Sequence, residues 1–274
     1  MRKFFQFIKA VLICGMPILY YHIFYMCRYA RHPEKYPMEK RYKVVRKEIR
    51  MVFKHFHVDY KMENLEMFTS LNEKCLIISN HHSFFDPLAV IAASEKPLTF
   101  VCKKEIFKMP FVGKVAKAID CFPLDRENIM SQLTQIRNIV SYLKDQEKPS
   151  VLIYIEGTRN QNPADACLDF HPGTLKIAQM AGVPILVAAS YASFRVVDMG
   201  HYLKKYPYFF KIFKNISPEE AKKFNTTELA PILRKETNDH VNMLKAQDKA
   251  YVYALKMSNK RKELETRFDV SAES

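Results

Sequence analysis

Short apolar runs alternate with amphipathic stretches over most of the chain beyond about residue 62. The apolar runs are bounded by polar or turn-forming residues, which is typical of buried β-strands, and they occupy residues 75–79, 98–102, 119–124, 150–155 and 184–190. The stretches between them carry apolar residues at helical spacing, which predicts helices at 87–94, 111–118, 127–145 and 173–182. Two further helices are expected at about 218–244 and 246–267.

Strands that alternate with helices favour an α/β fold, in which helices flank a mostly parallel sheet on both faces. Asp125 precedes the helix expected at 127–145, and we interpret it as the N-cap of that helix. The chain shows no internal repeat and no linker long enough to separate a second domain. We therefore expect one domain at residues 63–244, followed by a C-terminal helical tail at 245–274.

An uncharged apolar run occupies residues 10–27, where His22 is the one clearly polar side chain. Eighteen helical residues span about 27 Å, close to the hydrocarbon thickness of a bilayer, roughly 30 Å. No small-residue cleavage site follows the run, as it would in a signal peptide. We expect a membrane-associated helix, and Pro17 and His22 leave open whether it spans the bilayer or lies in its interface.

Positive charge gathers beside this run. The chain has 274 residues, and its 43 Lys or Arg and 29 Asp or Glu give a formal charge of +14. Residues 1–62 contain fourteen of these basic residues and four acids, hence +10 of the total. Ten of the fourteen lie at positions 28–54, directly after the apolar run, and three precede it, which predicts that the body of the protein lies on the cytoplasmic face of the cell membrane. We interpret residues 1–62 as a membrane helix with a basic segment that attracts anionic lipid, and no nucleic-acid-binding motif accompanies the charge.

The overall composition is ordinary for a globular protein, with 48 % hydrophobic and 26 % charged residues, and excludes a disordered or low-complexity chain. Six cysteines lie far apart, without a C-x-x-C pair or the Cys/His spacing of a zinc site. They are interpreted as reduced thiols of a protein that faces the cytosol, and we expect no metal.

Polar residues follow several of the predicted strands, at the edge where open α/β sheets bind ligands. After the first strand comes NHHSFFD, in which His81 and Asp86 are five residues apart across a strand-to-helix turn. A carboxylate at that distance can bond one imidazole nitrogen, fix the tautomer and leave the other nitrogen to act as a general base. Alone, the pattern fits equally well a capped helix start beside a surface histidine.

Three further clusters follow. FPLDR (122–126) ends in the charged pair Asp125–Arg126, which alone could be a solvated ion pair. EGTRN (156–160) combines Gly157, which permits close backbone approach, with Thr158 and the planar guanidinium of Arg159, a group suited to phosphate. The same residues would also fit an ordinary turn without a ligand. In GVPILV (182–187), Pro184 opens a buried strand, as in many αβ loops.

Together, NHHSFFD, FPLDR, EGTR and VPI resemble the motifs of the lysophosphatidic acid acyltransferase family, as do FVCKKEIFKMPFVG (100–113) and FHPGTLKIA (170–178). The resemblance covers roughly residues 70–220 and implies acyl transfer to the sn-2 hydroxyl of 1-acylglycerol 3-phosphate, giving phosphatidic acid. It implies that His81 is the general base and that Asp86 orients it. The glycerol phosphate would be held by Lys103, Arg126, Glu156, Gly157, Thr158 and Arg159, with Pro184 shaping the apolar side of the site.

The resemblance further implies an acyl thioester of acyl carrier protein or coenzyme A as co-substrate, and no cofactor. Two positions depart from the family pattern, since Tyr154–Ile155 replaces a frequent Phe-Pro and Asn160 a frequent Ser. Other lyso-lipids or glycerol 3-phosphate stay open as acceptors. The alternatives are a metal-dependent phosphohydrolase with His81, His82 and Asp86 as ligands, and a non-catalytic membrane-binding module, which would leave the motif spacing unexplained. Acyl chain length and oligomeric state are left open.

Overall fold

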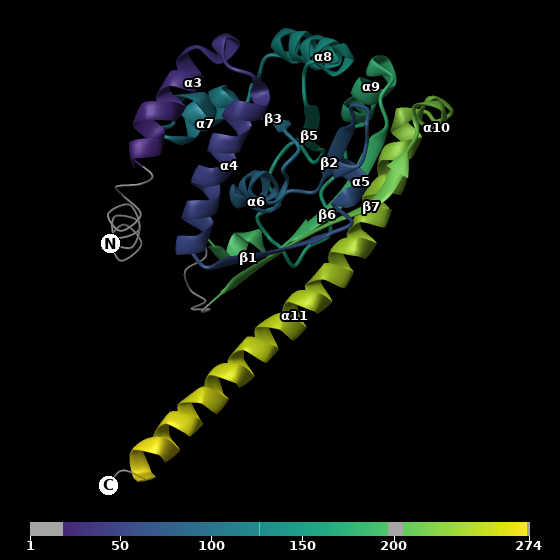
Figure 1. The fold of residues 1–274 in the computed structure, drawn as a ribbon. Coiled ribbons are helices and arrows are strands. Elements are labelled where there is room, and N and C mark those ends of the chain that lie inside the picture. Colours follow the sequence, from purple (N-terminus) through teal and green to yellow (C-terminus); the bar gives the residue numbers. More distant parts are fainter. Residues whose placement is uncertain (1–18, 126, 197–204, 273–274) are drawn as a thin grey trace.

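The computed structural model describes residues 19–125, 127–196 and 205–272. Seven strands form one sheet in the order β1-β7-β6-β2-β5-β3-β4 (Figure 1). The strands are β1 (Val58–Glu63), β2 (Leu76–Ser79), β3 (Leu98–Lys103), β4 (Phe122–Leu124), β5 (Ser150–Tyr154), β6 (Ile185–Tyr191) and β7 (Tyr206–Ile216).

The five strands from β2 to β6 run parallel to one another, whereas β7 pairs antiparallel with β6 and β1 pairs parallel with β7. The expected α/β fold with a mostly parallel sheet and flanking helices is confirmed. Because parallel strands end at one edge, the segments that follow β2, β3, β4, β5 and β6 all emerge on the same side of the sheet.

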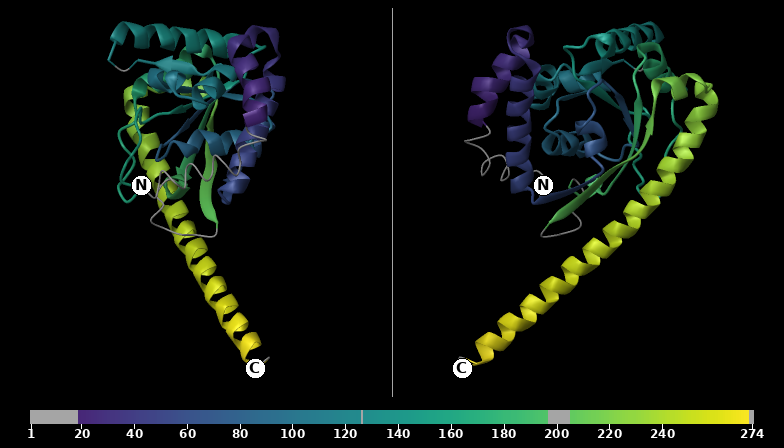
Figure 2. Two further views of the ribbon diagram at one scale, coloured as in Figure 1. Left: turned by 90° about the vertical axis from the view of Figure 1, so that its left-hand side faces the viewer. Right: turned by 45° about the vertical axis from the view of Figure 1, so that its right-hand side comes forward.

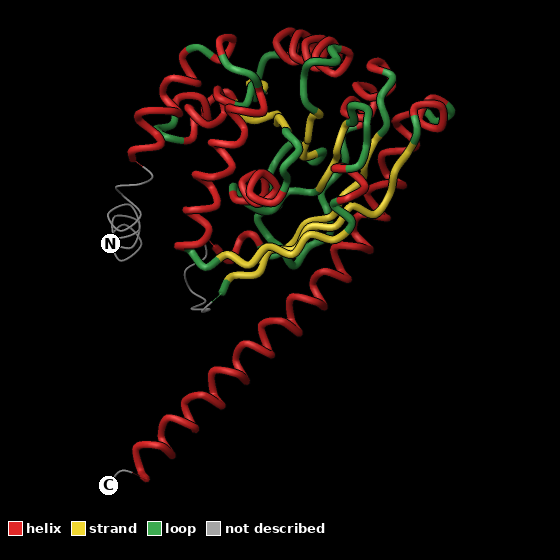
Figure 3. Tube along the Cα trace, viewed as in Figure 1, coloured by secondary structure: helices red, strands yellow, loops and turns green. Residues whose placement is uncertain are grey.

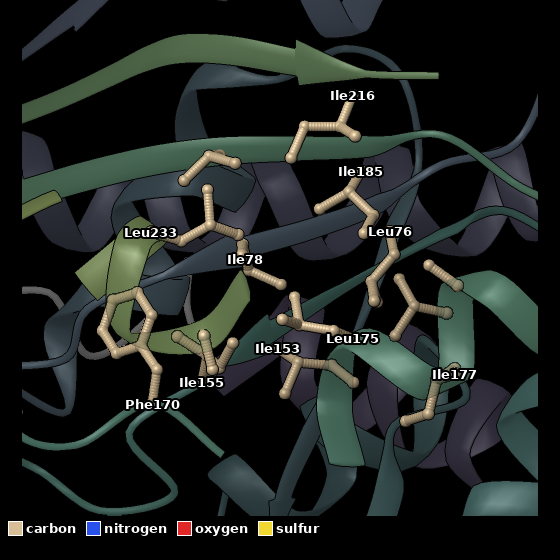
Figure 4. Packing of buried hydrophobic residues seen from close by; sticks show 14 of the residues in the cluster. Leu76, Ile78, Ile153, Ile155, Phe170, Leu175, Ile177, Ile185, Ile216 and Leu233 are labelled. Carbon is tan, nitrogen blue, oxygen red and sulfur yellow. The ribbon is translucent and has the colours of Figure 1, made fainter. Parts of the chain in front are cut away.

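Helices cover both faces of the sheet, as Figure 3 shows. One face packs against α4 (Met38–His55), α6 (Phe85–Ala93) and α7 (Val112–Ala118), and the other against α8 (Ile129–Lys144), α9 (Pro172–Ala181) and α11 (Thr226–Ala272). Branched side chains of β2, β5, β6 and β7 pack against α9 and α11 in the second core (Figure 4). Shorter elements are η1 (His22–Met26), α3 (Cys27–Arg31), η2 (Pro33–Lys35), α5 (Glu66–Thr69), η3 (Lys104–Lys108), η4 (Ser193–Val196) and α10 (Pro218–Lys222).

The C-terminal helices differ from the prediction. A break near residue 245 was expected, but α11 runs unbroken from Thr226 to Ala272 and extends well beyond the sheet (Figures 1 and 2). The break lies at 223–225 instead, after the short α10. Leu244 and Asp248 are both buried against the body, and Asp248 pairs with Arg195, so packing continues through the position where the helix was expected to stop.

Two strands and one long helix were not predicted. β1 and β7 form one end of the sheet, and the predicted boundary between residues 62 and 63 falls inside β1. In α4, the many basic residues hide an amphipathic pattern, because Tyr42, Val45 and Ile49 recur at helical spacing and are buried. The part of the N-terminal basic segment that forms α4 therefore packs against the sheet as part of the fold.

The N-terminal apolar run is described only in part, since residues 10–18 lie outside the described ranges. Within those ranges, no helix combines the length and apolar character that crossing a bilayer requires. Met26 and Tyr29 are buried in the core, and His22 Nδ1 lies 3.2 Å from Glu48 Oε1 of α4. The end of this run therefore packs on the body.

Arg41 belongs to the basic segment that was expected to attract anionic lipid, but its side chain faces the interior. Its guanidinium is buried and donates to the carbonyl oxygen of Ala118 at 2.6 Å and to Asp120 Oδ1 at 2.7 Å. This pair fastens α4 to the end of α7, so Arg41 is a structural residue.

Candidate active site

The NHHSFFD turn holds a histidine and a buried aspartate in direct contact. It follows β2 and leads into α6, whose first turn carries Asp86. Asp86 Oδ2 lies 2.7 Å from His81 Nδ1 and also accepts the backbone N–H groups of His82 and Ser83, each at 2.9 Å. Three donors on one oxygen fix the carboxylate and, with it, the orientation of the imidazole.

The charge state of Asp86 follows from these contacts. Complete burial disfavours the carboxylate, but the hydrogen bond and positive charge of His81, together with nearby His82, outweigh burial and hold the pKa of Asp86 below its usual range. Asp86 is therefore ionised at neutral pH. The His81 side chain is 17 % exposed, so its ring reaches solvent while its Nδ1 atom is held from behind.

The strand ends beside the turn are tied together by Asn80. Its amide group accepts from the N–H of Ser190 at 2.8 Å and donates to the Ser190 carbonyl oxygen at 3.0 Å, which joins the end of β2 to β6. His82 is buried against Tyr191 and Phe194, and burial lowers its pKa. His82 thus belongs to the packed support of the turn and not to its exposed face.

The EGTRN turn follows β5, the strand next to β2. Its backbone reverses at Gly157, whose φ of +64° favours glycine, and a Cβ there would come within 2.7 Å of His171 Nε2. Thr158 and Arg159 are exposed, and in the described ranges Arg159 has no ion-pair partner. Arg159 is accordingly free to bind an anion beside His81.

Glu156 behaves differently from the two residues that follow Gly157. Its side chain is buried, and neither of its carboxylate oxygens has a hydrogen-bond partner. Burial raises the pKa of Glu156 to about 8; the nearby backbone N–H of His81 opposes this shift, and the Asp86 charge adds to it. The structure thus separates Glu156, a neutral acid under the turn at pH 7, from the exposed pair of Thr158 and Arg159.

The third cluster contributes Lys103, the last residue of β3, which is exposed at the same edge and pairs in register with Leu124 of β4. Arg126 lies outside the described residues. Asp125 was expected to cap α8, but Asn128 is the N-cap instead, since its side chain accepts from Ser131 N at 3.0 Å. Asp125 instead pairs with Lys104, at 2.7 Å.

Pro184 lies at the opposite edge of the sheet. Its carbonyl oxygen accepts from Leu76 N at 3.0 Å, at the amino end of β2, whereas Ser190 meets Asn80 at the carboxyl end. Ser190 lies six residue steps along the strand from Pro184, a distance of about 20 Å. The expectation that Pro184 shapes the site was therefore wrong. Pro184 precedes the amino end of β6, and only the carboxyl end of that strand lies at the site.

Three residues near His81 received no role from the sequence. The ring of Tyr154 stacks on that of His81, with centroids 4.1 Å apart and planes 17° from parallel. Asn160 donates its backbone N–H to the His81 carbonyl oxygen at 2.7 Å, and His171 lies against Gly157. Tyr154 and Asn160 are the two departures from the family pattern, and this was the signal that could have singled them out.

Across the described parts of the chain, no three His, Cys, Asp or Glu side chains gather in a group that could hold a metal ion. His82 turns away from the other two proposed ligands and toward Asn80, whereas His81 Nδ1 is held by Asp86. The structure therefore offers no support for a phosphohydrolase with these ligands. A carboxylate-held imidazole near exposed cationic side chains is instead an arrangement suited to abstracting a proton from an anionic substrate.

Comparisons with known proteins agree with this chemistry. Residues 58–190 match the family model described as Acyltransferase. The chain is 31 % identical over 188 residues to a probable 1-acyl-sn-glycerol-3-phosphate acyltransferase of Mycoplasma genitalium, and 28 % identical over 191 residues to that of Mycoplasma pneumoniae. These matches cover 65 % and 67 % of this chain, and 66 % and 69 % of the two relatives.

A solved structure, that of the 1-acyl-sn-glycerophosphate acyltransferase of Thermotoga maritima, has the same fold. It superposes with a TM-score of 0.66 at 22 % identity, covering 90 % of this chain and 98 % of that one. The chain belongs to the acyltransferase family that includes the 1-acyl-sn-glycerol-3-phosphate acyltransferases. The resemblance seen in the four motifs is thereby confirmed.

Proposed function

We propose that this protein transfers an acyl group from a thioester to the sn-2 hydroxyl of 1-acylglycerol 3-phosphate and so forms phosphatidic acid. The observation that carries the proposal is the 2.7 Å contact between His81 Nδ1 and Asp86 Oδ2 at the carboxyl edge of the sheet. The neighbouring turn after β5 carries the exposed Arg159, which has no ion-pair partner among the described residues. The names and sequences of the relatives support it.

In this mechanism His81 Nε2 takes the proton of the acceptor hydroxyl while Asp86 stabilises the imidazolium that forms. The hydroxyl oxygen attacks the thioester carbonyl carbon and gives a tetrahedral oxyanion. Collapse of that intermediate breaks the carbon–sulfur bond, and the departing thiolate takes the proton from His81. No side chain of the protein is acylated, and no cofactor takes part.

Substrate binding is assigned by charge. Arg159 and Lys103 are exposed cations at the edge where His81 lies, and Arg159 can contact a phosphate through two parallel N–H groups. Arg126, predicted from FPLDR, is a further phosphate ligand in this proposal. Neutral Glu156 does not repel the phosphate, and Gly157 lets the turn approach it closely. The acyl donor is a thioester of acyl carrier protein or coenzyme A.

The test is an assay of the full chain with lysophosphatidate, lysophosphatidylcholine or glycerol 3-phosphate, each combined with acyl carrier protein or coenzyme A thioesters. We expect phosphatidic acid from the first acceptor, and loss of product in the His81→Ala variant. His32→Ala, a histidine that pairs with Glu34 away from the site, is the matched control. Turnover of His81→Ala near the wild-type rate would overturn the mechanism, and preference for another acceptor would overturn the substrate.

We further propose that the N-terminal region holds the enzyme on the cytoplasmic face of the cell membrane. Large apolar side chains are exposed on η1 and beside α7, where the ring of Phe111 lies 4.6 Å from that of His22. On α4, exposed basic residues lie on the face opposite the buried one, at Lys40, Lys43, Lys47, Arg50 and Lys54. Apolar groups next to a basic stripe suit an anionic lipid surface.

The membrane proposal is tested with vesicles of anionic or neutral lipid. Replacement of Lys40, Lys43 and Lys47 by Gln should weaken binding to anionic vesicles alone, since the lost attraction is electrostatic. The control replaces the exposed Lys222, Lys223 and Lys249 by Gln, which changes the net charge equally. Equal loss in both triple variants, or on both kinds of vesicle, would contradict the assignment of the stripe.

A further inference from the structure

Buried hydroxyl groups form a layer beneath Asp86, across four adjacent strands. In the sheet order β7-β6-β2-β5, these strands contribute Tyr208, Ser190, Ser79 and Tyr154. Ser79 and Tyr154 are direct partners in the register of β2 and β5, and Ser190 is paired with Phe210, two residues from Tyr208. Ser79 is opposite Ala188 of β6, so Ser190 lies two residues nearer the carboxyl edge than Ser79 and Tyr154, and Tyr208 lies nearer still. The four side chains therefore form a row that runs towards the carboxyl edge of the sheet.

All four point to the face that α6 covers. Tyr154 and Tyr208 pack in the same core as Ala89 and Val90 of α6. Ser79 and Ser190 are each two residues from a strand residue of that core, Ile77 and Ala188, and side chains two apart share a face. Because α6 also carries Asp86, the aspartate lies over this layer.

Several oxygen atoms of this region are buried without a hydrogen-bond partner. They are Asp86 Oδ1, the hydroxyls of Tyr154 and Tyr208, and the Oγ atoms of Ser79 and Ser193. The five residues are at most 8 % exposed. Asp86 Oδ2 takes three donors, as described above, whereas Oδ1 takes none in full hydrogen-bond geometry, although the Ser193 hydroxyl is near enough to help lower the pKa of Asp86. Buried polar atoms are almost always satisfied by protein groups or ordered water, and so many together indicate a polar site.

Electrostatics agree that the tyrosines lie near the aspartate. Burial raises the pKa of Tyr154 and of Tyr208 well above the usual value, and the Asp86 charge contributes to both shifts. The same charge makes their neutral hydroxyls suitable donors, because Asp86 is ionised and can only accept. The titratable groups around Asp86 are His81 and His82 of its own turn, Tyr154 and Glu156 from β5 and its turn, Tyr208 from β7, and Lys245 from α11.

We propose that the hydroxyls of Tyr208 and Tyr154 hold Asp86 Oδ1 through buried water, which makes both tyrosines positioning residues for His81. The inference rests on the proposed function, in which His81 is the general base. A water molecule accepts from the hydroxyls and donates to the carboxylate oxygen, so that both oxygens of Asp86 are fixed and the imidazole cannot turn with the carboxylate. Tyr208 lies outside the matched family segment and outside every motif.

The experiment compares Tyr208→Phe and Tyr154→Phe with Tyr142→Phe in the full chain. Tyr142 of α8 also has a buried hydroxyl without a partner, but it packs against Phe122, away from the site. We expect kcat to fall about tenfold in the first two variants, with KM unchanged within about twofold, and no change in Tyr142→Phe. Loss of a donor destabilises ionised Asp86, so the acid limb of the pH–rate profile moves to higher pH.

A titration of the His81 imidazole by NMR gives a readout that needs no substrate. Removal of either hydroxyl should raise the pKa at which the His81–Asp86 pair takes up a proton, and Tyr142→Phe should leave it unchanged. If His81 shifts while the chain fails to acylate lysophosphatidate, the layer stands and the proposed function fails. Wild-type kcat, pH profile and His81 titration in both Tyr208→Phe and Tyr154→Phe would overturn the inference.

Discussion

Asp86 and Glu156 are both buried carboxylic acids at the carboxyl edge of the sheet, in the turns that follow the neighbouring strands β2 and β5. One oxygen of Asp86 accepts from three N–H groups, and the pKa of Asp86 is lowered. The oxygens of Glu156 have no partner in full hydrogen-bond geometry, and the nearby backbone N–H groups of His81 and Leu168 offset burial only in part, so its pKa is raised to about 8. At pH 7 the first is a carboxylate and the second a neutral acid.

The comparison shows that burial alone does not decide the charge of a carboxyl group here. Burial disfavours ionisation of both acids, and only the donors and positive charge around Asp86 reverse its effect. A strand-to-helix turn supplies those donors, because its backbone N–H groups point at the first turn of α6. The β5 turn reverses at Gly157, and its N–H groups bond to backbone carbonyl oxygens: that of Gly157 to Tyr154 and that of Asn160 to His81. Local backbone shape thus assigns the ionised role to Asp86.

The strongest test of this difference is Asp86→Asn. We expect kcat to fall about 10³–10⁴-fold, as when the orienting carboxylate of a serine-protease triad is replaced, because the amide no longer fixes the His81 tautomer or stabilises the imidazolium. Steady-state kinetics with lysophosphatidate measures the loss, and thermal unfolding checks that the variant is folded. A folded variant within about tenfold of the wild-type kcat would refute the ionised, orienting role.

Arg159→Ala removes the free cation of the second turn and should act on binding. We expect KM for lysophosphatidate to rise about 10- to 100-fold with a smaller change in kcat, since a charged bidentate contact to the phosphate is lost. Arg159→Lys, which keeps the charge but not the planar fork, should recover part of the loss. A fall in kcat at constant KM would place Arg159 with the catalytic pair instead.

Gly157→Ala tests whether the shape of the second turn is needed. The φ of +64° and the approach of His171 within 2.7 Å of an added Cβ predict a loss of about 1–3 kcal/mol in the free energy of unfolding. Gly173→Ala is the control, because it lies in α9 with no atom within 4 Å of an added Cβ. Urea unfolding distinguishes the two, and equal stability of both variants would contradict the strained turn.

Glu156→Gln should have the smallest effect on turnover, less than about threefold at pH 7, because glutamine imitates the neutral acid. The raised pKa means that the stability from protonated Glu156 is fully present below its ordinary pKa of 4.5 and is lost progressively as pH rises to about 8. Urea unfolding between pH 5 and 9 should therefore show a decline in the wild type that is reduced in the variant. Identical pH profiles would mean that Glu156 is ionised.

Asp86 gives the opposite dependence, which sharpens the comparison further. Its lowered pKa contributes stability that is present above its ordinary pKa of 3.8 and lost as pH falls through the folded-state value. Asp86→Asn should therefore flatten the acid side of the stability profile, and Glu156→Gln its neutral-to-alkaline side. Unfolding measured from pH 3 to pH 9 in both variants checks this separation.

The sequence predicted the parts of the fold whose hydrophobic pattern is local and strong. The strands β2, β3, β5 and β6 and the helices from α6 to α9 lie close to their predicted ranges, because apolar runs and helical spacing survive in the sequence whatever they pack against. The His81–Asp86 contact was also predictable, since it joins residues of a single turn.

The remaining parts depend on contacts that no local pattern shows. The charges of α4 mask its buried stripe, and Lys211 and Lys214 interrupt the apolar run of β7. Pro184 lies at the amino edge of the sheet, away from the site, because of the direction of β6. Glu156 is neutral because it is buried beneath its turn. Membership in one of the family motifs therefore did not ensure that a residue lies at the site.

Pro184 has a different importance once its place is known. The bond from Leu76 to its carbonyl oxygen begins the ladder between β6 and β2, which continues residue by residue to the contact of Asn80 with Ser190. A slip of one residue at that start would displace the far end by about 3.3 Å and turn every side chain to the other face. The alignment at one edge of the sheet thus sets the height at which His81 emerges at the other.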